Sequence, residues 1–146
     1  MTVLMAFLHH LAAFTLVAAV AVEFVLIRGE LTAASARKIV VADTVLGASA
    51  VVLLVVGLLR VFWFEKGGGY YLHSAPFLIK FALFVVLAGL SAVPTREFLS
   101  WRPALREGRA PVADLTRVRR IVHWELAGIV VILLCAAMMA RGVGSF

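Results

Sequence analysis

The chain contains four long apolar stretches, and each of them is long enough to cross a lipid bilayer as a helix. They cover approximately residues 3–27, 39–64, 74–93 and 121–140. Lipid offers backbone N–H and C=O groups no water, so such stretches span it as α-helices, which satisfy their own hydrogen bonds. We therefore predict an all-α polytopic membrane protein, a four-transmembrane-helix bundle that forms one domain over residues 1–146.

The composition excludes two other classes of protein. The chain is 64% hydrophobic and only 15% charged, which is incompatible with an ordinary soluble domain and with a disordered chain. The first apolar stretch follows no basic segment and carries two adjacent histidines, so we interpret it as a retained helix and not as a cleaved signal peptide.

The basic residues are distributed unevenly along the chain. Of the 14 lysines and arginines, ten flank the first and third connectors between the apolar stretches: Arg28, Arg37, Lys38, Arg96, Arg102, Arg106, Arg109, Arg117, Arg119 and Arg120. Basic connectors stay in the cytoplasm, which predicts a multi-pass protein of the bacterial inner (cell) membrane with both termini outside. This bias accounts for the net charge of +6 without a nucleic acid partner.

The densest polar stretch runs from Leu58 to Lys80 and joins the second and third apolar stretches. Its three glycines, at positions 67–69, allow either a close approach to a ligand or simply a flexible hairpin. It carries Arg60, Glu65, Lys66, Tyr70, Tyr71, His73 and Lys80.

Several of these side chains are expected at a similar depth in the membrane, in the leaflet next to the termini. His9 and His10 lie roughly 10 Å below the start of the first helix at 1.5 Å per residue. His73 and Lys80 are seven residues apart and share a helix face. We expect His10 to face the bundle in preference to His9, because apolar residues continue its face. The predicted cluster comprises His10, His9, His73, Lys80 and Arg60.

A second polar cluster is predicted near the cytoplasmic side, from Glu23, Asp43, His123 and Glu125. Ionisable groups inside a membrane are costly, so they face the bundle interior and mark function. Alternatively, these carboxylates pair with Arg37, Arg119 or Arg120.

The first cluster suggests a cofactor. Imidazole is the usual axial ligand of haem in helical bundles, and arginine and lysine suit the propionates of a porphyrin. The residues thus predict a b-type haem or porphyrin in a redox role, with His10 on the iron and no other metal. The alternative is a non-enzymatic accessory subunit or small transporter, without a cofactor, acting as a homo-oligomer or with a membrane protein partner. No CxxCH, hydrolytic triad or zinc motif is present, and whether the protein is an enzyme stays open.

Three segments carry a resemblance to known families: HHLAAFTLVAAVAVE, LLRVFWFEKGGGYYLHSAPFLIKFALF and RRIVHWELAG. Over essentially its full length, the chain resembles an uncharacterised bacterial family of predicted four-helix membrane proteins with no established activity. More distantly, it is similar to the HemJ-type membrane protoporphyrinogen oxidases, which have a histidine in the first helix and a histidine followed by a lysine at the start of a middle helix. This second resemblance implies b-type haem at His10 or His9, and Lys80 as a partner of the porphyrin or of a proton path.

Overall fold

The computed structural model describes residues 2–64 and 66–144, so Glu65 lies outside the described residues. Its long helices are α1 (Thr2–Leu26), α2 (Ala33–Leu59), α4 (Ala75–Ser100) and α6 (Thr116–Ala140). A π-helical turn, η1 (Arg60–Phe64), extends α2, and the short helices α3 (Gly68–Leu72) and α5 (Arg102–Arg106) lie in the second and third connectors. Within the described residues, four helices are long and apolar enough to cross a membrane, which confirms the predicted fold class.

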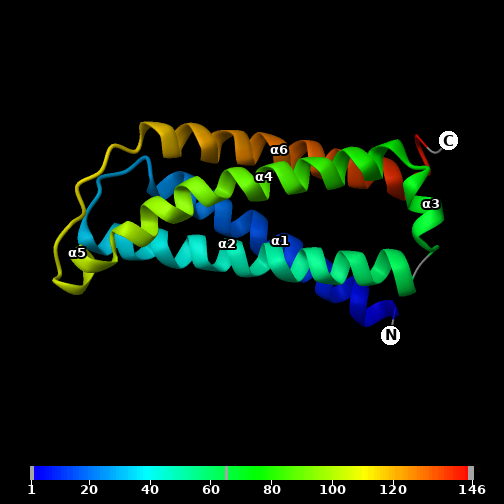
Figure 1. The fold of residues 1–146 in the computed structure, drawn as a ribbon, viewed down its shortest axis with the longest axis horizontal. Helices are drawn as coiled ribbons and strands as arrows, with labels where there is room; N and C mark the ends of the chain where they lie inside the picture. Colours follow the sequence, from blue (N-terminus) through cyan, green and yellow to red (C-terminus); the bar gives the residue numbers. More distant parts are fainter. Residues whose placement is uncertain (1, 65, 145–146) are drawn as a thin grey trace.

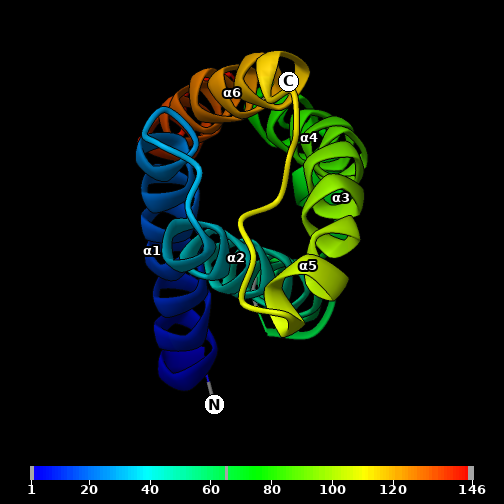
Figure 2. The ribbon, with the colours of Figure 1, turned by 90° about the vertical axis from the view of Figure 1, so that its left-hand side faces the viewer.

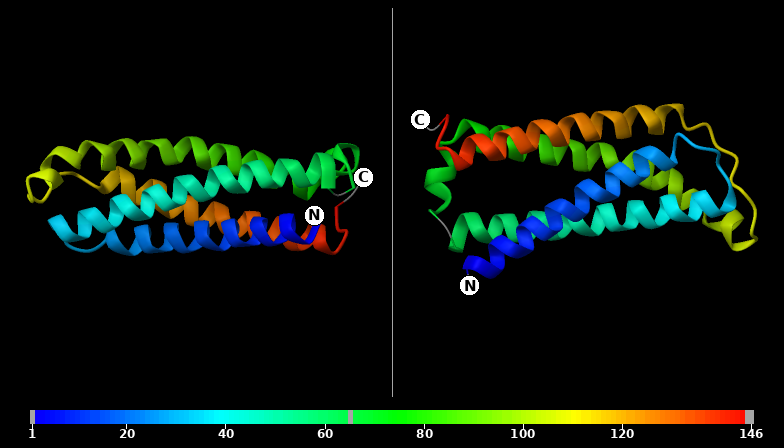
Figure 3. Two further views of the ribbon diagram at one scale, coloured as in Figure 1. Left: turned by 90° about the horizontal axis from the view of Figure 1, so that it is seen from below. Right: turned by 180° about the vertical axis from the view of Figure 1, so that it is seen from behind.

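The long helices run along the long axis of the molecule as two antiparallel pairs (Figure 1). Both termini lie at one end, here called the termini end, and α5 with the basic connectors lies at the other, here called the loop end. In the end-on view of Figure 2, the helices form a ring in the order α1, α2, α4, α6. Helix α1 packs chiefly against α2 and α4 against α6, and α1 is inclined to the other helices (Figure 3). The interior of the bundle therefore lies between the two pairs.

The third membrane helix is longer than the sequence predicts. We expected it to end near residue 93, because Pro94 lacks the N–H that continues a helix. Instead, α4 continues through Pro94 to Ser100. Pro94 and Phe98 are fully buried and Trp101 is nearly so. Burial of these side chains offsets the single hydrogen bond that the proline removes, as is common for prolines in membrane helices.

The starts of the helices are set by local hydrogen bonds. Thr32 caps α2, because Thr32 Oγ1 accepts from the Ser35 N–H at 3.1 Å and Ser35 Oγ accepts from the Thr32 N–H at 2.8 Å. Asp114 Oδ1 accepts from the Thr116 N–H at 3.0 Å and also from the Thr116 hydroxyl. These hydrogen bonds hold the pKa of Asp114 below its usual value. Helices α2 and α6 therefore begin several residues before the predicted boundaries.

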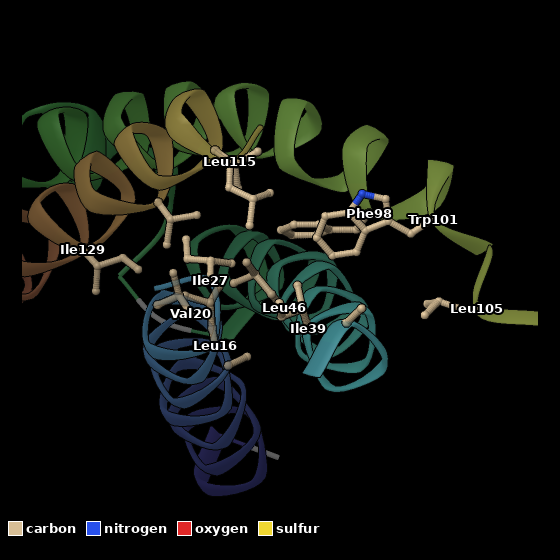
Figure 4. Close-up of a cluster of buried hydrophobic side chains, with 14 residues drawn as sticks. Leu16, Val20, Ile27, Ile39, Leu46, Phe98, Trp101, Leu105, Leu115 and Ile129 are labelled. Carbon is tan, nitrogen blue, oxygen red and sulfur yellow. The ribbon is translucent and has the colours of Figure 1, made fainter. Parts of the chain in front are cut away.

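The two helix pairs meet in a packed apolar core at the loop end. The rings of Phe98 and Trp101 have centroids 5.0 Å apart and lie among aliphatic side chains from α1, α2 and α6 (Figure 4). Two arginines also join separate segments there. Arg119 Nε donates to the Ile27 carbonyl oxygen at 2.7 Å, and Arg37 Nη2 donates to that of Leu105 at 3.1 Å. The buried members at the loop end include Ile27, Ile39, Phe98, Trp101, Leu105, Leu115, Val118 and Val122. The apolar cluster continues toward the termini end through Leu16, Val20, Leu46 and Ile129.

The close packing of α4 against α6 depends on a glycine. A Cβ atom at Gly128 of α6 would lie 2.6 Å from Leu87 Cδ1 of α4, well inside van der Waals contact. Small residues at such crossings let membrane helices approach closely, where packing is a main source of association energy. Gly89, in contrast, has no atom within 4 Å of its ideal Cβ position.

Replacing Gly128 should therefore separate the α4–α6 pair. We expect Gly128→Val to cost about 1–3 kcal/mol in the free energy of unfolding, the usual range for overpacking. Gly89→Val is the matched control on the neighbouring helix and should have a smaller effect. Thermal unfolding of both variants in one detergent measures the difference. Equal loss of stability in the two would show that Gly128 is not a close-packing position.

Candidate functional site

Two cavities, each partly open at the surface of the bundle, lie between the helix pairs. The first, nearer the termini end, has a volume of about 240 Å³, and its lining includes His9, Arg60, Tyr71 and Lys80 among apolar residues. The second, of about 330 Å³, lies further toward the loop end and adjoins Ser91, Thr95 and Glu125. They are neighbours along the bundle, because both are lined by Ala13, Leu53, Phe84, Ile132 and Leu133.

A third cavity, of about 320 Å³, opens at the termini end. It is lined by Arg60, Lys66, Tyr70, Tyr71 and Ser74, together with Met139 and Ala140. It shares Arg60, Tyr71 and Met139 with the first cavity. The three cavities therefore follow one another from the termini end toward the middle of the bundle, and the outermost is rich in cationic and aromatic side chains.

The two adjacent histidines of α1 point in different directions. His9 is half-buried and lines the first cavity, where its ring packs against Gly57 of α2. A Cβ atom at Gly57 would lie 3.4 Å from His9 Cε1, so the glycine makes room for the imidazole. His10 is exposed and its Nδ1 lies 2.6 Å from the Ala6 carbonyl oxygen of its own helix. The expectation that His10 faces the bundle in preference to His9 is therefore wrong, because the crossing of α1 over α2 turns His9 inward.

The remaining members of the first predicted cluster are only partly brought together. Arg60, in the π-helical turn after α2, and Lys80 of α4 both line the first cavity with His9. His73 is exposed, and its Nδ1 lies 2.7 Å from the Gly69 carbonyl oxygen. It does not share a helix face with Lys80, because α4 begins only at Ala75. The site at the termini end thus comprises His9, Arg60 and Lys80, with Tyr71 beside them.

The second predicted cluster is largely assembled. The carboxyl groups of Glu23 (0% exposed), Asp43 (7%) and Glu125 (4%) come from α1, α2 and α6 and interact electrostatically with one another. We call these three residues the carboxyl cluster. From α4, the Thr95 hydroxyl donates to Asp43 Oδ1 at 2.9 Å, and the Ser91 side chain interacts with the Glu125 carboxyl group. All four long helices therefore contribute to this site.

The carboxyl groups of the cluster do not form the ion pairs with arginine that the sequence analysis gives as an alternative. Arg37 and Arg119 donate to backbone carbonyls instead, and no described lysine or arginine forms an ion pair with any of the three carboxyl groups. Within the described residues, both oxygens of Glu23 and Oε2 of Glu125 have no hydrogen-bond partner. His123 is exposed and stands apart from the cluster.

Sequence reasoning overlooked Ser91 and Thr95. A signal was present, since the two hydroxyls are four residues apart and share one face of an apolar helix. Hydroxyl side chains are frequent in membrane helices, where they form hydrogen bonds to the backbone of their own helix. Ser91 and Thr95 therefore indicate a site less clearly than the charged residues do.

Four apolar helices surrounding internal polar groups define a polytopic helical membrane protein, whose outer faces contact the lipid bilayer. The chain belongs to the family described as "Predicted membrane protein (DUF2214)", whose profile matches residues 1–144. The predicted membership of an uncharacterised membrane protein family is thus confirmed. No curated protein and no solved structure matches the chain significantly.

The unpartnered carboxyl group of Glu23 should cost stability. Burying a polar group without a hydrogen bond costs about 1–3 kcal/mol. We therefore expect Glu23→Met, which keeps a similar volume, to raise the free energy of unfolding by roughly this amount. Glu97→Met is the control and should lower it, because Glu97 Oε1 accepts from Trp101 Nε1 at 3.1 Å. Denaturation of the two variants in mixed micelles measures both effects. A marked loss of stability in Glu23→Met would show that Glu23 is compensated in the folded protein.

Proposed function

We propose that this protein binds a planar, apolar ligand that carries carboxylates, b-type haem or a porphyrin, in the first cavity, and serves a redox role in the membrane. The observation that supports this proposal is that one imidazole and two cationic side chains, those of His9, Arg60 and Lys80, line one cavity whose remaining lining is apolar apart from Tyr71. Cofactor sites in helical bundles are built in this way, from side chains on facing helices.

The polar residues match the chemical groups of such a ligand. Its ring is larger than the first cavity of about 240 Å³, so it would also occupy an adjoining cavity. His9, in place of His10, would hold the iron of a haem. Arg60 and Lys80 pair with the carboxylates through charge-assisted hydrogen bonds, which strengthen where water is scarce. Phe77, Phe81 and Phe84 line the same cavity and would pack against the ring. Bound haem supplies one-electron chemistry, while the chain holds and orients it.

The orientation in the membrane follows from the charges. The basic connectors lie together at the loop end (Figure 1). By the positive-inside bias this end faces the cytoplasm, so the termini end and the outermost cavity face outward in the bacterial inner membrane. The ligand then enters from the outer side, past Lys66 and Tyr70.

A second candidate function needs no cofactor. The succession of three cavities from the termini end to Glu125 supports a small transporter or an accessory subunit that admits a solute part of the way into the membrane. The outward faces of α4 and α6 carry exposed apolar residues such as Val85, Val86 and Val130, which suit lipid, a second copy or another membrane protein.

Haem titration of the detergent-purified protein tests the first candidate. We expect a Soret band and, after reduction with dithionite, sharp α-bands. His9→Ala should abolish these bands, because it removes the axial ligand, whereas His10→Ala should retain them. The adjacent exposed histidine is thus the matched control. A wild-type protein that stays colourless, or equal loss of the bands in both variants, would contradict the proposal and leave the second candidate.

The same titration tests the cationic side chains. Hydrogen bonds to charged groups contribute about 1.5–3 kcal/mol, so Arg60→Gln and Lys80→Gln should each weaken haem binding at least tenfold. Lys38→Gln, at the exposed loop end, should leave the affinity unchanged. Unaltered affinity in the Arg60 and Lys80 variants would show that the carboxylates of the ligand bind elsewhere.

A further inference from the structure

The carboxyl cluster lies between two unlike parts of the bundle. On its termini side is the second cavity, which Glu125 and Thr95 line. On its loop side is the packed core, where Ile27, Phe98 and Val122 are at most 1% exposed. The second cavity therefore reaches the cluster at Glu125, and apolar side chains separate the cluster from the basic connectors.

Three carboxyl groups in this position require a positive counterpart. An ionised carboxylate is costly in an apolar interior, and several together are costlier still. The protein does not supply that counterpart from its own described lysines and arginines, since none pairs with the cluster. The unpartnered oxygens of Glu23 and Glu125 are buried, and their carboxyl groups interact electrostatically with the rest of the cluster. Together these features point to a small cation as the ligand.

The geometry favours the proton over a metal ion. A metal ion needs several ligands that converge on one point. Among residues 2–64 and 66–144, no group of three His, Cys, Asp or Glu side chains is arranged to hold one. A proton needs only one carboxylate oxygen, and hydroxyl groups such as those of Ser91 and Thr95 can pass it on by hydrogen bonding.

The neighbouring charged groups do not replace this ligand. On α1, the Arg28 guanidinium lies 4.1 Å from the centre of the Phe24 ring. On α2, Arg37 donates to the Leu105 carbonyl, and on α4, Glu97 accepts from Trp101. On α6, Arg119 donates to the Ile27 carbonyl. The remaining charged or titratable groups at this end of the long helices are exposed: Lys38, Arg96, Arg117, Arg120 and His123.

We propose that the carboxyl cluster is a proton-binding site within the membrane, loaded through the cavities from the termini end. Glu125 receives the proton first, because its carboxyl group is the one that lines the second cavity. The proton then passes from the Glu125 carboxyl group to a carboxylate oxygen of Asp43 or Glu23, and no electrons are exchanged. Glu23 is fully buried and is therefore the proton-binding group that lies furthest from solvent. This inference does not depend on the identity of the ligand in the first cavity.

An apolar carbodiimide tests the proposal on the wild-type protein, because such reagents modify protonated carboxyl groups in apolar surroundings. The full-length protein in lipid vesicles is treated at a series of pH values, and the modified residues are identified by mass spectrometry. We expect modification of Glu125 at neutral pH, declining as the pH rises. The exposed Glu30 and Glu107 should stay unmodified at neutral pH and serve as internal controls.

A pair of variants tests the route. Ile132 lines both the first and the second cavity, so Ile132→Trp should slow the modification of Glu125 several-fold without touching the carboxyl groups. Val130→Trp, on the outward face of the same helix, is the matched control and should leave the rate unchanged.

Three outcomes would overturn the proposal. The first is the absence of modification at Glu125 and Glu23 at every pH. The second is protection of Glu125 by sodium at constant pH, which would make the cluster a sodium site. The third is equal slowing in both tryptophan variants, which would place the route outside the cavities. Because no haem is used, failure here is distinct from failure of the haem titration.

Discussion

The packed core at the loop end is the contact on which the rest of the bundle depends. Phe98 and Trp101 of the α4 segment share one apolar core with Ile27, just after α1, and Ile39 of α2, and thereby connect the two helix pairs. Within a bilayer, close packing has to supply much of the association energy that the hydrophobic effect supplies in water. The two helix pairs are held together at the loop end. They can therefore separate toward the termini end, where the cavities lie.

The internal polar groups are sorted by charge along the bundle. Arg60 and Lys80 lie around the first cavity, and the carboxyl groups lie next to the second. The carboxyl groups are buried and pair with no described lysine or arginine, so they require a positive partner. The half-buried cationic groups suit an anionic ligand, and the buried carboxyl groups suit protons. The two proposals thus concern separate parts of the bundle.

The four spans could be predicted from the sequence because the bilayer fixes their length and apolar character. The carboxyl cluster could also be predicted, since Glu23, Asp43 and Glu125 reach one depth through the connectivity alone. The choice between His9 and His10 could not, because it depends on the angle at which α1 crosses α2. The continuation of α4 past Pro94 could not be predicted from the sequence either, because burial in the core at the loop end outweighs the tendency of proline to end a helix.

The central claim is that the interior is reached from the termini end and sealed at the loop end. Thiol labelling tests it directly, in a Cys135→Ala background that removes the native cysteine. Ala136→Cys faces the first cavity and Val122→Cys lies in the sealed core. A small, charged, membrane-impermeant thiol reagent should react with the cysteine at position 136 only from the side of the termini, and with that at 122 from neither side. Reaction at position 122 from the loop side, or none at position 136, would contradict the account.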